Sequence, residues 1–64
     1  MNKGVEIEVA IEIISLYIAI EYKNNNLEKV ENLKLEREEI YKGNISSVEK
    51  VIKEYAPEIK KIIS

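Results

Sequence analysis

The sequence predicts an all-α protein: a small three-helix bundle, made of a helical hairpin and a kinked C-terminal helix, that is completed by oligomerisation. Two breaks built from helix-stopping residues divide the 64 residues into three segments of similar length, which make a single helical domain over residues 1–64. Apolar residues recur at helical spacing in these segments. The chain has no cysteine and no histidine, so association remains as the means of stabilising so small a core.

The first break is Lys23-Asn24-Asn25-Asn26. Asparagine tolerates left-handed backbone and also caps helices, so this tract can end one helix and begin the next. With Asn25 as N-cap, Glu28 falls at the third helical position and completes a capping box. We therefore expect one helix over about 5–23 and a second over about 27–42.

The second break is Gly43-Asn44. Gly43 suits the left-handed position that closes a helix. Ser46 followed by Glu49 forms a second capping box, which predicts a third helix over about 47–63.

The first segment carries two conflicting patterns. From Val5 to Ile13, β-branched residues alternate with glutamates or alanine, as in a half-buried strand. The alternation breaks at Ile13-Ile14, and the segment up to Tyr22 contains no glycine or proline after Val5. This length favours a helix, and a strand over 5–13 stays open as the alternative.

On a helical wheel the first segment has two apolar seams that point in nearly opposite directions. Both have 4-3-4 spacing. The first seam is Ile7, Ile11, Ile14 and Ile18, and the second seam is Val9, Ile13, Leu16 and Ile20. One gap between them holds Ala10 and Tyr17, and the other holds Glu8, Glu12, Ser15 and Ala19.

The other two helices of the chain can cover one seam and part of the second, and an apolar remainder of this size marks an interface. We expect the second seam to pack against its copy in another subunit. The predicted interface residues are Val9, Ile13, Leu16, Tyr17 and Ile20.

The middle segment has an apolar face that two long basic side chains interrupt. Leu27, Val30, Leu33, Ile40 and Tyr41 share this face with Lys34 and Arg37, while Leu35 lies outside it. Arg37 either extends its charge past the edge of the core or forms an ion pair with a glutamate of the first helix, which would fix the register.

The last segment is the clearest amphipathic helix. Its apolar face is Val48, Val51, Ile52, Tyr55, Ile59, Ile62 and Ile63. Pro57 lies on the polar side, where a bend wraps a helix around a core. The sequence predicts a kink or a short break near Tyr55.

The charge pattern does not indicate a particular class of partner. The net charge is −2, and almost every lysine has a glutamate nearby, whereas affinity for nucleic acid needs a concentrated basic face. The longest uncharged run, Ile13 to Ile20, is far shorter than the roughly 20 residues of a membrane span. The expectation is a cytoplasmic protein with no membrane contact.

The glutamate clusters are the only candidates for metal or acid–base chemistry. Glu8 with Glu12, and Glu36 with Glu38 and Glu39, place carboxylates near one another. Solvated helix faces carry such spacings as a rule, and helical di-metal sites pair glutamate with histidine. We expect no catalytic residue, no metal, no cofactor and no small-molecule substrate.

Residues 42–64 resemble the opening helix of region 2 in bacterial sigma factors. The matching positions are Gly43, Asn44, Val48, Ile52, Tyr55, Pro57 and Ile59. The resemblance covers about a third of the chain, puts Val48 where the family has a small residue, and does not include the segments that bind polymerase or melt promoter DNA.

The function that these observations favour is protein–protein interaction, as a small non-enzymatic regulatory, inhibitory or immunity-type protein such as phages and mobile elements encode. Its partners are further copies of itself and another protein. The alternative is a transcription-linked or nucleic-acid-contacting module that uses the basic face of the last helix, Lys50, Lys53, Lys60 and Lys61.

Overall fold

The computed structural model describes residues 3–63, apart from the Lys3 side chain, and confirms the all-α, three-helix fold. Residues 5–13 are helical, and the described residues contain no strand. The helices are α1 (Lys3–Lys23), α2 (Leu27–Tyr41), α3 (Ile45–Lys50) and α4 (Ala56–Ile63). A π-helical turn, η1 (Val51–Tyr55), joins α3 to α4 without a break, so these three elements form the third helix of the bundle.

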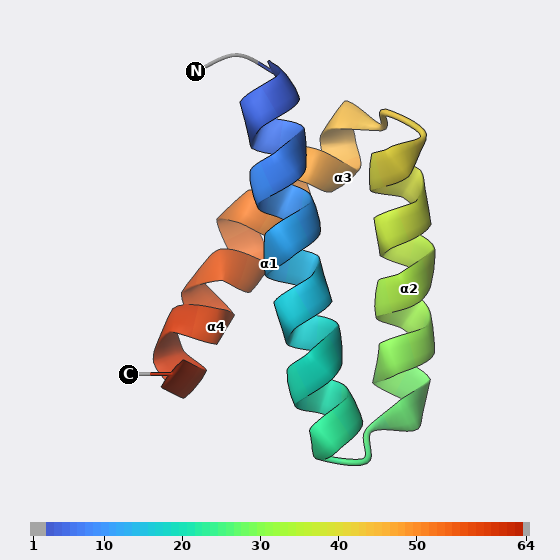
Figure 1. Ribbon diagram of the computed structural model, residues 1–64, viewed down its shortest axis with the longest axis vertical. Helices are drawn as coiled ribbons and strands as arrows, with labels where there is room; N and C mark the ends of the chain where they lie inside the picture. The colour runs from blue at the N-terminus through green and yellow to red at the C-terminus, as the bar shows by residue number, and fades with distance from the viewer. Residues whose placement is uncertain (1–2, 64) are drawn as a thin grey trace.

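The third helix crosses the hairpin of α1 and α2 (Figure 1). Helix α1 contacts both α2 and the third helix, whereas α2 and α4 do not meet. The chain measures 34 × 25 × 14 Å along its principal axes, and packed helices lie about 8–10 Å apart. The molecule is therefore two helix layers thick, and α1 keeps one side uncovered.

The buried line of α1 runs along the edge of the first seam, from which it takes Ile14, and through the gap that holds Ala10 and Tyr17. Its four buried residues, Ala10, Ile14, Tyr17 and Glu21, have 4-3-4 spacing. At about 100° per residue the two seams lie about 160° apart, and Ala10 and Tyr17 point between them. The core is completed by side chains from the other helices: Leu33, Ile40, Val48, Val51 and Ile59.

The turn between α1 and α2 is closed by Asn25, whose φ is +63°. The Asn25 N–H donates to the Tyr22 carbonyl (3.0 Å) and the Asn26 N–H to the Glu21 carbonyl (2.9 Å), which is a Schellman motif. The predicted N-cap role of Asn25 is wrong, because the N-cap of α2 is Asn26. The Asn26 side chain donates instead to Glu21 Oε2 at 2.8 Å.

The second turn repeats this arrangement. Gly43, with φ +88°, takes the left-handed position as predicted, and its N–H donates to the Ile40 carbonyl. The N-cap is Asn44 and not Ser46, since Asn44 Oδ1 accepts from the Ser46 N–H at 3.0 Å. The third helix therefore begins at Ile45, two residues before the predicted start.

The expected irregularity near Tyr55 takes the form of the π-helical turn η1, in which the Ala56 N–H donates to the Val51 carbonyl. Pro57 follows directly and has no N–H to donate. In a regular helix its ring would clash with the Lys53 carbonyl, four residues earlier. A wider turn relieves this clash, and the helix continues through Pro57 to Ile63.

Candidate protein-interaction surface

The second seam forms an apolar strip on the uncovered side of α1. Val9 and Leu16 are 39% and 44% exposed, and Ile13 and Ile20 are half-buried. Ile13 also packs against the core. The strip therefore has a half-buried side beside the core and an open side that faces solvent.

Glu8 and Glu12 border the open side of the second seam, and both are exposed. No basic group lies within ion-pair distance of either carboxylate among the side chains that the structure describes. The uncovered face of α1 thus combines apolar side chains with unneutralised negative charge.

Tyr17, which the sequence assigned to the interface, belongs to the core. Only 5% of its surface is exposed. Its ring packs edge-on against Tyr55 at a centroid distance of 5.3 Å, and its hydroxyl accepts a 2.8 Å hydrogen bond from Lys29 Nζ. This hydrogen bond raises the pKa of Lys29 above its ordinary value, although partial desolvation opposes the shift. The remaining surface of the second seam is Val9, Ile13, Leu16 and Ile20.

Arg37 contacts the hydroxyl group of Ser15 on α1. Its Nη1 lies 3.4 Å from Ser15 Oγ, a long hydrogen bond. Of the two alternatives for Arg37, the ion pair with a glutamate of the first helix does not form, because among the described side chains Arg37 has no ion-pair partner. The contact joins α2 to Ser15, which lies in the gap between the two seams of α1 that also holds Glu8 and Glu12.

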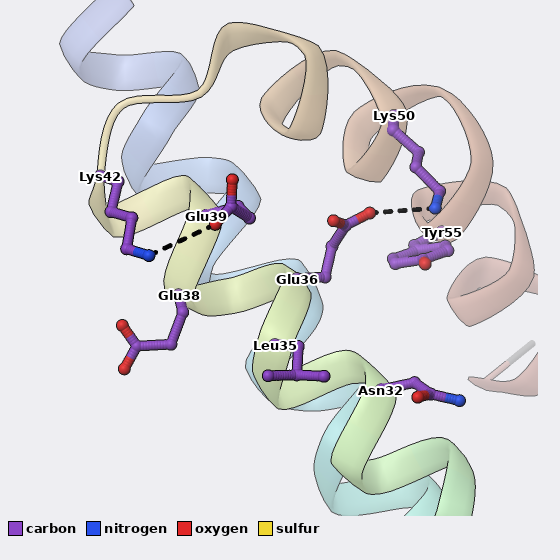
Figure 2. A pocket seen from close by; sticks show the side chains of 8 residues that line it. All are labelled: Asn32, Leu35, Glu36, Glu38, Glu39, Lys42, Lys50 and Tyr55. Atoms are coloured by element: carbon purple, nitrogen blue, oxygen red, sulfur yellow. Dashed lines mark ion pairs between the residues drawn. The ribbon is translucent and has the colours of Figure 1, made fainter.

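A pocket with a volume of about 380 Å³ lies between α2 and the third helix (Figure 2). Glu36 reaches across it to Lys50, with 3.0 Å between Oε1 and Nζ, and also accepts a 3.3 Å hydrogen bond from Ser47 Oγ. Oε1 is shielded from solvent and has no aligned hydrogen bond, so its contact with Lys50 is an ion pair. The Glu36 carboxylate raises the pKa of Lys50 above its ordinary value.

The second carboxylate of this pocket that has partners is Glu39. Its Oε1 accepts from Asn44 Nδ2 at 3.2 Å, and its Oε2 lies 3.5 Å from Lys42 Nζ. The Asn44 hydrogen bond, followed by the Lys42 charge, lowers the pKa of Glu39. Figure 2 shows Glu38 pointing outward, away from Glu36. These carboxylates bind lysine and asparagine side chains of the same chain and do not converge on one point.

Two further features are absent from the described residues. Between residues 3 and 63, no three acidic side chains gather in a way that would hold a metal ion. Within the same part of the chain, no helix has both the length and the apolar character that crossing a bilayer requires.

The end of α4 is a second apolar surface, which the sequence analysis missed. Ile62 and Ile63 were assigned to the buried face, yet they are 49% and 67% exposed, while Ile59 is buried. Figure 1 shows the reason: the C-terminal end of α4 diverges from α1. The π-helical turn and Pro57 re-aim the helix, and the periodicity of the sequence does not contain that change of direction.

No family model, curated protein or solved structure matches this chain. Its function is therefore inferred from the surface of this chain alone. The exposed large apolar side chains include a group on α1 and a group at the end of α4, and such groups suit contact with other proteins. Others lie on and beside α2: Tyr22, Leu27, Leu35, Tyr41 and Ile45.

Proposed function

We propose that this chain is a small, non-enzymatic protein–protein interaction module that acts through self-association, in the manner of a regulatory, inhibitory or immunity-type protein. Its interface includes the second seam, Val9, Ile13, Leu16 and Ile20. Further copies of the chain and one other protein are its partners, and the proposal includes a cytoplasmic location. It assigns the chain no cofactor, metal or small-molecule substrate.

The observation that carries the proposal is the exposure of Val9 and Leu16 on the side of α1 that no other helix covers. The large solvent-accessible surface area of the chain also supports the proposal. That surface is 4632 Å² for 7.4 kDa, whereas a monomeric protein of this mass normally exposes about 4200 Å². A second copy that covers the second seam would remove apolar surface from water at about 25 cal/mol per Å².

The alternative, a nucleic-acid-contacting module, has less support. Of the four lysines assigned to its basic face, Lys50 pairs with Glu36 and lies over the Tyr55 ring at 5.9 Å. Affinity for phosphate depends on undiluted positive charge, so three lysines at most remain for this role.

Sedimentation velocity from low to high micromolar concentration tests the proposal. We expect wild type to form a dimer or larger species, Leu16→Glu to remain monomeric, and both to have the same helical circular dichroism. Leu35→Glu is the matched control, because Leu35 is a more exposed leucine, at 67%, on α2. A wild-type chain that stays monomeric throughout contradicts the proposal, and salt-dependent binding to DNA supports the alternative.

A further inference from the structure

The two apolar areas border groups of opposite net charge, because Glu8 and Glu12 flank the α1 area, whereas Lys60 and Lys61 outnumber Glu58 on α4. On α1, Val9 and Leu16 lie beside Glu8 and Glu12. At the end of α4, Ile62 and Ile63 follow Lys60 and Lys61. Glu8, Glu12 and Lys60 have no ion-pair partner among the described side chains. The two areas are therefore complementary in charge as well as apolar.

A symmetric contact between two α1 helices would bring negative charges together. In an antiparallel pair centred near Ile13, Val9 of one copy would meet Leu16 of the other, and the apolar residues would match. The two Glu12 carboxylates would then lie on the same side of the helix pair and face each other across the twofold axis, with the two Glu8 residues further along. Like charges placed together at an interface oppose association and disfavour that partner.

The residue spacing on α1 and on α4 fits a contact between α1 of one copy and α4 of another. Lys60 and Ile63 are three residues apart and share a face of α4, while Glu12 and Leu16 are four apart on α1. One helical turn therefore separates charge from apolar side chain on both surfaces. When Lys60 lies opposite Glu12, Ile63 lies opposite Leu16.

We infer that the second seam of α1 binds the α4 end of another copy of this chain, so that Ile63 covers Leu16 while Lys60 pairs with Glu12. This inference rests on the proposed function, self-association, and specifies which surfaces meet. Because the two surfaces differ, every open assembly keeps one free α1 surface and one free α4 surface until a ring closes. A contact of this type builds rings or open chains.

Two variants that each lose one surface test the inference by mixing. Leu16→Glu removes the α1 surface and keeps the α4 end, and Ile63→Glu does the reverse. We expect each variant alone to be monomeric and the equimolar mixture to form a one-to-one heterodimer, resolved by native mass spectrometry with one variant isotope-labelled. Leu35→Glu should assemble as wild type does.

A charge exchange provides the second test with little risk to folding, since Glu12 and Lys60 are exposed. Glu12→Lys and Lys60→Glu should each weaken association by about tenfold. The double variant should regain most of it, because each contact again joins a lysine to a glutamate.

The outcomes separate this inference from the proposed function. A monomeric wild type overturns both. A wild type that associates, together with an Ile63→Glu variant that associates equally well, keeps the function and overturns the inference, since that result indicates a symmetric α1 contact. A mixture that yields no heterodimer, or a double variant no tighter than the single ones, also overturns it.

Discussion

Ile14→Ala should remove a large share of the stability of this fold. Ile14 is fully buried in the cluster that joins α1 to α2 and the third helix. The change deletes three carbons at about 0.8 kcal/mol each, and the cavity adds to this, so we expect a loss of about 3 to 4 kcal/mol. A chain of 64 residues has a total free energy of unfolding of about 3 to 10 kcal/mol.

Urea unfolding followed by far-ultraviolet circular dichroism measures this loss, at a concentration low enough for association to add nothing to stability. Leu16→Ala is the matched control. It deletes the same number of carbons from a side chain that is 44% exposed, so the monomer should lose only about 1 kcal/mol. Equal losses for the two variants would refute the assignment of Ile14 to the core and of Leu16 to the surface.

Three further changes test the turns and the ion pairs. Gly43→Ala should cost about 1 kcal/mol from backbone strain alone, because a Cβ there meets nothing within 4 Å, and Gly43→Asn should cost less in the same urea titration. Asn44→Ala should cost about 1 kcal/mol through loss of the cap, with faster amide exchange at Ser46 as the direct readout. The raised pKa values of Lys29 and Lys50 stabilise the fold below about pH 10.5 and stop doing so as pH rises through them. The free energy of unfolding should therefore fall in alkali, and less steeply in Lys50→Met.

The sequence predicted the fold class well because helix periodicity and the two breaks agree. It could not place the buried line of α1, since nine of the residues between Val5 and Ile20 are Val, Ile or Leu and the wheel alone does not say which part of a wide apolar arc faces the partner helices. Tyr17 illustrates this. Its burial follows from contacts with Lys29 and Tyr55, which lie on other helices.

The turns contain a signal that the sequence analysis missed. In both, an asparagine N-cap donates its side-chain N–H to a glutamate five residues earlier: Asn26 to Glu21, and Asn44 to Glu39. A left-handed residue precedes each asparagine. This recurrence at an interval of 18 residues assigns both caps correctly, and it gives the buried Glu21 carboxylate a partner.

Pro57→Ala separates two causes of the π-helical turn. In a regular helix Val51 and Ile59 would point about 80° apart, and the extra residue of a π-helical turn rotates Ile59 back by about 100°. Both side chains are buried, and exposing Ile59 would cost about 2 to 3 kcal/mol, more than the one backbone hydrogen bond that a regular turn gains. The turn should therefore persist in Pro57→Ala, with the Tyr17–Tyr55 contact intact by nuclear Overhauser effects. The free energy of unfolding should rise by up to about 3 kcal/mol, since alanine suits a helix interior. If the turn instead becomes regular and Ile59 is exposed, then Pro57, and not the packing of Ile59, is what fixes the direction of α4.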